Sequence, residues 1–255
     1  MGRLADLLLE EKIEVDSKFK KQLERATKYL SRKGKILILT TSNRGDLSSK
    51  DGKDSPKSTR IAEVMQRTIG GDKCTLIDVS KLKIYNCEGN VSSKDGNNCG
   101  VREAALKDKE KNPTGNLRCW ASYNNPDDEL WRIANPLFEC NVVVFMGSIR
   151  WGQANAIYQK LIERLDWIEN RWASLGERNV VKGIESGFIF TGQNWNGAEV
   201  VKTQKKVHEF YGFKPAHDLY FNWQYTEDAL DESRDSYRDA AHALDNIIDI
   251  RDLLK

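Results

Sequence analysis

The sequence predicts an α/β protein with a five-stranded parallel sheet and helices on both faces of that sheet. Two observations support this fold class. Strand-like segments alternate with helical segments from residue 34 onward, which is the order of a parallel sheet. The strand-like segments are also continuous apolar runs, as expected for strands buried on both faces. The expected strands are residues 35–40, 74–79, 141–146, 187–191 and 217–223.

Helical periodicity accounts for the segments between these strands. Phe19, Leu23, Ala26 and Leu30 recur at helical spacing and predict a helical N-terminal extension over residues 1–33. The remainder, residues 34–255, is expected to form one domain. Its first two predicted helices begin near Ser58 and at Asp127, the second with a kink or early stop at Pro136. Two further helices are expected at 153–172 and 198–211. A final helix closes the chain, with Tyr237, Ala241, Leu244 and Ile248 on one face.

A long irregular stretch, residues 80–126, follows the second expected strand. Glycine, asparagine, serine and proline are scattered through it, so we predict an insertion without long helices or strands. A stretch of this length in a compact domain is usually functional or part of an interface. Its three cysteines, Cys87, Cys99 and Cys119, are widely spaced and contain no Cys-x-x-Cys pair, so we predict no metal site there.

Composition limits the partners and the compartment. Lys and Arg total 40 against 38 Asp and Glu, which gives no basis for nucleic acid or an anionic membrane as the main partner. No run approaches the roughly 20 apolar residues needed to cross a bilayer. The N-terminus lacks the features of a secretory signal, and five cysteines are an odd number. We therefore expect a cytoplasmic protein that has neither nucleic acid nor a membrane as a partner.

Three segments follow expected strands and should meet at one edge of the sheet, where ligands bind in open α/β folds. They are residues 41–59, 147–152 and 191–197. The first ends in Ser58 and Thr59 at a helix start, where hydroxyl and backbone N–H groups suit a phosphate. Arg44, Lys57 and Arg60 could add positive charge. The alternative is that Ser58 only caps the helix.

The second and third segments combine glycine with tryptophan. Trp151 precedes Gly152 and follows Arg150, and a flat aromatic ring beside permissive backbone suits a planar ring ligand. The alternative is that Trp151 packs against a neighbouring helix. The third segment has the same character and contains Thr191, Gly192, Asn194, Trp195 and Gly197.

These segments resemble three loops of one family in their order and spacing. Residues 41–44, Thr-Ser-Asn-Arg, and Ser58-Thr59 are similar to the two ends of a Gly-Ser-Pro-Arg…Asn-Thr loop, separated by an insertion at about 45–57. Residues 147–152 are similar to a Ser/Thr-Pro-Val-Tyr-Trp-Gly loop. Lys160 and Glu163-Arg164 stand where the family has a Lys and an Asp-Arg pair. Over about residues 35–225, the sequence resembles the flavodoxin-like NAD(P)H-dependent FMN reductases.

Within that family the resemblance is to the branch of iron-sulfur flavoproteins and related quinone reductases, without their tight cysteine cluster. It implies a flavodoxin-like sheet that holds FMN. Ser148 replaces the family's proline and Arg150 its tyrosine, so a more cationic ring environment is expected. The implied cofactor-binding residues are Ser42, Arg44, Ser58, Thr59, Gly147, Ser148, Ile149, Arg150, Trp151, Gly152, Thr191, Gly192, Asn194 and Gly197.

The resemblance also implies an activity. NAD(P)H would reduce FMN, and the reduced flavin would pass electrons to a small acceptor such as a quinone, a flavin or a specialised metabolite. This chemistry requires no protein acid or base, so the sequence assigns no catalytic residue. Members of the family are commonly homodimers or homotetramers. The alternatives are a flavodoxin-type electron carrier without its own substrate, and an interaction scaffold that has lost its flavin.

Overall fold

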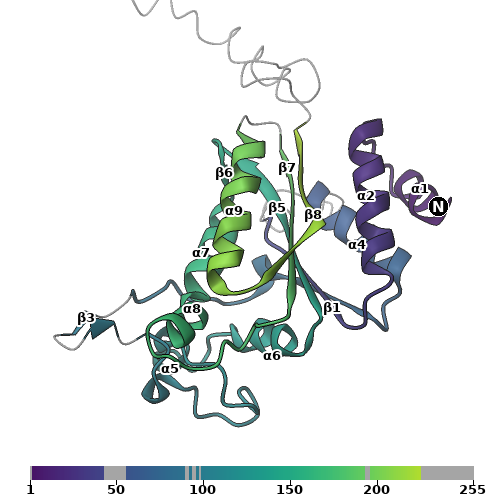
Figure 1. Cartoon of the computed structure of the whole chain (residues 1–255). Helices are drawn as coiled ribbons and strands as arrows, with labels where there is room; N and C mark the ends of the chain where they lie inside the picture. Colours follow the sequence, from purple (N-terminus) through teal and green to yellow (C-terminus); the bar gives the residue numbers. More distant parts are fainter. Residues whose placement is uncertain are drawn as a thin grey trace, which may run out of the picture.

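Five parallel strands form the centre of the molecule, in the order β2-β1-β5-β7-β8 (Figure 1). The computed structural model describes residues 2–42, 56–89, 92–93, 96–97, 99–192 and 196–224. The predicted parallel α/β sheet is confirmed. Its strands are β1 (Ile36–Thr40), β2 (Cys74–Asp78), β5 (Val142–Arg150), β7 (Glu185–Gly192) and β8 (Lys214–Gln224).

The strand order reverses between β1 and β5. The chain passes from β1 to β2 on one side, and β5 then pairs with the other side of β1, with Thr40 opposite Met146. All five residues of β1 are buried, as its apolar sequence predicts. The helix that follows β1 and the helix that follows β5 cover opposite faces of the sheet. In open α/β sheets, ligands bind beside the carboxyl ends of two such strands.

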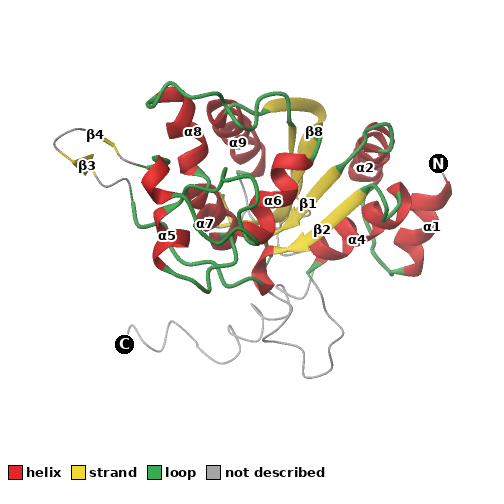
Figure 2. Cartoon of the chain, turned by 90° about the horizontal axis from the view of Figure 1, so that it is seen from below, coloured by secondary structure: helices red, strands yellow, loops and turns green. Residues whose placement is uncertain are grey.

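Helices cover both faces of the sheet, and each face has its own apolar core (Figures 1 and 2). One face is covered by α1 (Gly2–Glu10), α2 (Ser17–Leu30) and α4 (Lys57–Ile69). The other face is covered by α6 (Trp131–Glu139), α7 (Ala156–Arg164), α8 (Asp166–Ala173) and α9 (Gly197–Tyr211). In the part of the chain that the structure describes, no helix is long and apolar enough to cross a membrane.

The N-terminal helices belong to the cover of the sheet. Residues 1–33 were expected to be helical, and they form two helices that are separated by residues 11–16. Asp16 caps α2 by accepting a hydrogen bond from the backbone N–H of Phe19 at 2.8 Å. The Phe19 ring stacks on Trp223 of β8 with centroids 5.0 Å apart. The outermost parallel strand is therefore covered by a helix that precedes the sheet in sequence.

Two segments differ from the sequence prediction. Residues 147–150 were expected in a loop, but they extend β5, which turns back at Trp151 and Gly152 to pair with β6 (Gln153–Ala154). Residues 153–172 were expected to form one helix, but the chain breaks at Leu165 into α7 and α8. No proline lies at or next to Leu165, so proline does not cause this break. The helix expected from Asp127 begins at Trp131 as α6 and continues through Pro136 to Glu139, so of the kink or early stop predicted at Pro136 the early stop is wrong.

The insertion at 80–126 is mostly irregular, as predicted. Its short elements are η1 (Val79–Lys81), β3 (Ser92–Ser93), β4 (Gly96–Asn97), η2 (Arg102–Ala104) and α5 (Trp120–Asn124). The buried side chain of Asn112 organises one turn by donating to the carbonyls of Leu106 and Leu117 at 2.9 and 3.1 Å. The expected closing helix with Tyr237 lies outside the described residues, as do Asn43, Arg44, Asn194 and Trp195.

Candidate functional site

The two ends of the first predicted binding segment meet at the carboxyl end of β1. Ser42 follows β1 and Ser58 lies in the first turn of α4, and their hydroxyl oxygens are 2.7 Å apart. Both side chains are buried, at 5% and 1% exposure. The two ends of this segment therefore lie together, and their role in binding a phosphate stays a prediction. The structure does not describe residues 43–55 between them.

The N-terminus of α4 has unused hydrogen-bonding capacity. Its N-cap is Pro56, which makes no side-chain capping bond. The alternative that Ser58 caps the helix is therefore wrong. Thr59 is 5% exposed, and its Oγ1 atom has no hydrogen-bond partner among the described residues. Unpaired donors at a helix N-terminus, together with the helix dipole, form a favourable environment for an anion.

The basic residues near this segment do not converge on the N-terminus of α4. The guanidinium of Arg60 donates to the backbone carbonyl of Glu11, so it is directed toward the connection between α1 and α2. The ammonium of Lys57 lies 5.5 Å from the centre of the Trp223 ring. Arg44 lies outside the described residues.

The second segment forms the tip of the β5–β6 hairpin. Trp151 and Gly152 have φ values of 50° and 69°, so both central residues of this two-residue turn are left-handed. Arg150 and Trp151 are exposed, and 75% of Trp151 is accessible to solvent. Trp151 is therefore not buried against the helices that the structure describes. A bulky residue in this conformation is costly, which makes the exposed ring a functional candidate.

Asn155 connects the first and second segments, and the sequence analysis missed it. Its Nδ2 donates to the carbonyl of Thr41 at 2.7 Å, and its Oδ1 lies 3.1 Å from the Thr41 hydroxyl. The same Oδ1 accepts the backbone N–H of Tyr158 at 3.2 Å and caps α7. An asparagine directly before a helical repeat was an available signal. This buried residue fixes the end of β1 against the start of α7.

The glycines of the second and third segments lie in close backbone and side-chain contact. A Cβ atom on Gly147 would lie 2.4 Å from the Thr41 hydroxyl, and one on Gly192 would lie 2.9 Å from the carbonyl of Ile149. A Cβ on Gly197 would lie 2.4 Å from the side chain of Asn222. Packing within the protein thus accounts for these glycines, whose role as flavin contacts stays a prediction.

The second and third segments also contact each other. Thr191 is buried and pairs with Ser148, which is half-buried at the neighbouring position of β5. Asn196, the N-cap of α9, has a φ of 68° and donates its side-chain amide to the carbonyl of Gly152 at 3.0 Å. The carboxyl ends of β1, β5 and β7 therefore bring all three predicted segments together at one edge of the sheet.

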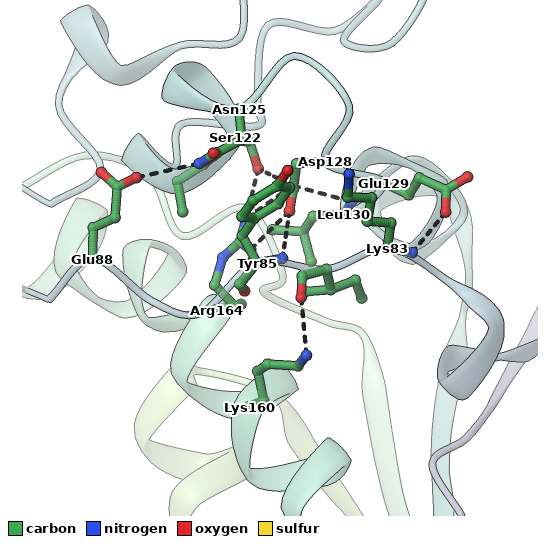
Figure 3. A network of polar contacts seen from close by, with 12 residues as sticks. Lys83, Tyr85, Glu88, Ser122, Asn125, Asp128, Glu129, Leu130, Lys160 and Arg164 are labelled. Carbon is green, nitrogen blue, oxygen red and sulfur yellow. Dashed lines mark hydrogen bonds and ion pairs between the residues drawn. The ribbon is translucent and has the colours of Figure 1, made fainter. Parts of the chain in front are cut away.

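Lys160 and Arg164 hold the insertion rather than lying open at this edge (Figure 3). Arg164 forms a fully buried bidentate ion pair with Asp128, with both nitrogen–oxygen distances at 2.9 Å. It also donates to the carbonyl of Tyr85 and the hydroxyl of Ser122 at 2.7 and 2.8 Å. Lys160 donates to the carbonyl of Ile84 at 2.9 Å. These contacts give both residues a structural role.

The cysteines are reduced and mostly buried. Cys87 is half-buried, the other four are buried, and none forms a disulfide. Burial raises the pKa of the Cys74 and Cys140 thiols to about 12, so both are neutral thiols at pH 7. Within the described ranges, no group of three or more His, Cys, Asp or Glu side chains is arranged to hold a metal ion.

Comparison with known proteins adds information on the fold. No protein-family model and no curated protein sequence matches the chain. A crystal structure of RosB with the bound intermediate 8-demethyl-8-formylriboflavin-5'-phosphate is similar over 82% of this chain and 70% of its own, at 13% identity and a TM-score of 0.53. A flavone reductase is similar over 74% of this chain and 54% of its own, at 11% identity and a TM-score of 0.41.

The Trp repressor binding protein of Bacillus subtilis is similar over 74% of this chain and 84% of its own, at 12% identity and a TM-score of 0.37. Of these three structures, RosB has the highest TM-score, and the comparison of folds rests on it. The resemblance predicted from the sequence is thereby confirmed at the level of the fold. The chain has a flavodoxin-like α/β fold, with strand order β2-β1-β5-β7-β8 and the fold of the RosB structure.

Proposed function

We propose that this protein is an FMN-dependent NAD(P)H oxidoreductase that passes electrons to a small acceptor such as a quinone, a flavin or a specialised metabolite. One observation carries the proposal. The N-terminus of α4, beside the Ser42–Ser58 pair, has a buried Thr59 hydroxyl without a partner among the described residues. It lies at the carboxyl end of β1, where the strand order reverses and an open α/β sheet binds its ligand.

The residues at this edge fit a flavin phosphate. Ser42, Ser58, Thr59 and the first N–H groups of α4 would bind the phosphate, since hydroxyl and amide donors complement a phosphate dianion. The turn at Trp151 and Gly152, with Arg150 before it and Thr191 and Gly192 beside it, would border the ring. The ligand in the similar RosB structure is a modified flavin 5'-phosphate, which supports this choice of cofactor.

The chain supplies binding and orientation, while the cofactor supplies redox chemistry. Bound FMN would supply the chemistry of hydride and electron transfer between the nicotinamide and the acceptor. Asn155 preorganises the site by holding the end of β1 through Thr41. Such preorganisation lowers the cost of ordering the loops when the cofactor binds. Trp151 at the hairpin tip is 75% exposed, so its ring would be accessible to a small substrate.

The first experiment is the visible absorption spectrum of the purified full-length protein, before and after anaerobic NADPH or NADH. Flavin bands that bleach rapidly on addition of nicotinamide support the reductase. Flavin bands that persist favour an electron carrier reduced by another protein. A protein that takes up no added FMN would overturn both. The resemblance also supports a homodimer or homotetramer, and light scattering after size-exclusion chromatography tests the oligomeric state. The cytoplasmic location is proposed from the sequence composition alone.

A further inference from the structure

A second hollow lies on the helical layer that covers β8. It is a groove of about 900 Å³ between α1 and α2, with Thr68 of α4 contributing to its wall. None of its lining residues belongs to the proposed flavin site. Figure 1 shows α1 and α2 side by side on the flank of the sheet. A groove of this size on an outer layer can hold either a small molecule or the side chains of another segment.

The groove is strongly basic. Five cationic residues line it and Glu24 is its one acidic lining residue. Within the described part of the chain, none of the five cations forms an ion pair, so their charge is not neutralised locally. Like charges at this density favour an acidic occupant. The five residues are Arg3, Lys18, Lys21, Arg25 and Lys28.

The groove also has apolar surface and an unsatisfied hydroxyl. Leu4 lies in its wall beside the alkyl stems of the basic residues. Thr27 lines it as well, is only 5% exposed, and its Oγ1 has no hydrogen-bond partner among the described residues. A buried hydroxyl without a partner is costly. The combination suits a segment that presents apolar, polar and acidic side chains together.

The chain contains one segment with this chemistry. Residues 225–255 carry nine acidic and four basic residues, and Tyr237, Ala241, Leu244 and Ile248 recur at helical spacing. The segment begins directly after β8, and Trp223 near the end of β8 stacks on Phe19 in the first turn of α2 at 5.0 Å. Trp223, two residues before this segment, therefore lies beside the first turn of α2, where Ser17 and Lys18 line the groove.

We propose that residues 225–255 dock in the basic groove between α1 and α2 of the same molecule, with the Tyr237–Ile248 stripe facing the groove. The acidic residues that flank this stripe would pair with the cations of α2. Docking would give the N-terminal helices a role in holding the C-terminal segment against the edge of the sheet. It would also give the buried Thr27 hydroxyl a polar partner.

Hydrogen–deuterium exchange on the full-length protein tests this proposal. In the wild type, amides of residues 235–250 should exchange about 10-fold or more slowly than in an unstructured peptide. Lys21→Glu combined with Arg25→Glu should remove that protection, because it reverses charge in the groove at two exposed positions. Lys205→Glu with Lys206→Glu on the exposed surface of α9 is the matched control and should leave protection unchanged.

A compensating pair makes the test specific. Asp235→Lys with Asp239→Lys, added to the groove variant, should restore protection by reforming pairs of opposite sign. Unprotected amides in the wild type, or protection that both groove and control variants retain, would overturn the proposal. Protection that disappears on dilution would assign the groove to a second copy of the chain and would also overturn docking within one molecule.

Discussion

The hydroxyl oxygens of Ser42 and Ser58 lie 2.7 Å apart, although the two residues are 16 positions apart in the chain. This pair closes the connection between β1 and α4 at its base. It leaves the next residue, Thr59, with a buried hydroxyl that bonds nothing in the described part of the protein. Buried hydroxyls in native proteins are usually hydrogen-bonded, and a bound phosphate oxygen would accept a hydrogen bond from this one.

Thr59→Val tests this assignment. Valine keeps the shape of the side chain and removes only the hydroxyl, so we expect the dissociation constant for FMN to rise about tenfold, which corresponds to about 1.4 kcal/mol. The free energy of unfolding without cofactor should not fall, because Thr59 Oγ1 has no partner in the described protein. Fluorescence titration with FMN and chemical denaturation measure the two effects.

Two controls accompany this variant. Riboflavin lacks the phosphate, so its affinity should be the same for wild type and Thr59→Val. Thr68→Val lies on the same helix, where its hydroxyl bonds the carbonyl of Val64 at 2.7 Å, and should leave FMN affinity unchanged. Equal FMN affinity in wild type and Thr59→Val would place the phosphate elsewhere.

The sheet could be predicted from the sequence because strands that are buried on both faces are continuous apolar runs. β1 and the first residues of β5 are unbroken apolar runs, and their register from Ile36 opposite Val142 to Thr40 opposite Met146 buries them all. The location of Ser42 and Ser58 at this edge of the sheet was also predictable. Ser42 follows a parallel strand and Ser58 lies in the first turn of the next helix, so both lie at the carboxyl end of that strand. Local sequence and topology agree at these positions.

Other features depend on distant contacts and were not predictable from local sequence. The extension of β5 ends in a turn with Trp151 at positive φ, where the usual residues are glycine or asparagine. The break between α7 and α8 follows Arg164, whose partner Asp128 is 36 positions away. Asn155 fixes Thr41 across 114 positions. At Trp151 and at the α7–α8 break, tertiary packing outweighs local propensity, whereas at Asn155 only the contact with Thr41 was unpredictable, since asparagine is a favourable N-cap.

Trp151→Gly should separate stability from function at the hairpin tip. Glycine removes the cost of a left-handed bulky residue, and the lost side chain is 75% exposed, so we expect the free energy of unfolding to rise by about 1 kcal/mol. If the ring borders the flavin, the visible spectrum of the bound cofactor should shift. Phe210→Ala, at an exposed aromatic residue on α9, should leave that spectrum unchanged. An unaltered spectrum for Trp151→Gly would mean that the isoalloxazine lies elsewhere.

Asp128→Asn should destabilise the protein by about 3–5 kcal/mol, because it leaves the buried Arg164 charge without its partner. Burial by itself would raise the pKa of Asp128, but the hydrogen bonds and charge of Arg164 outweigh it and hold the pKa below its ordinary value. The pair therefore stabilises the fold above about pH 4 and loses that effect as the pH falls further.

Urea denaturation at pH 7 and at several acidic values measures the effect of Asp128→Asn. Glu139→Gln is the matched control, since it removes one partner of the exposed Lys35–Glu139 pair, whose atoms are also close at 3.0 Å. This control should leave stability unchanged. A loss of stability as small for Asp128→Asn as for Glu139→Gln would show that the buried network does not hold the insertion to α7.

His208 should make stability depend on pH in a higher range. Its ring is buried between the hydroxyls of Tyr158 and Tyr220, at 3.0 and 2.6 Å, and burial lowers its pKa to about 3. In the unfolded chain this imidazole has a pKa near 6.5. The contribution of the neutral ring to the free energy of unfolding is therefore fully present above that pH. It is lost as the pH falls toward 3, by up to about 1.4 kcal/mol per pH unit. His208→Gln should abolish this slope between about pH 6 and pH 4, whereas His217→Gln, at a side chain that is 93% exposed, should preserve it. Urea midpoints across that range decide the matter, because an identical slope in wild type and His208→Gln would show that the native state protonates this ring.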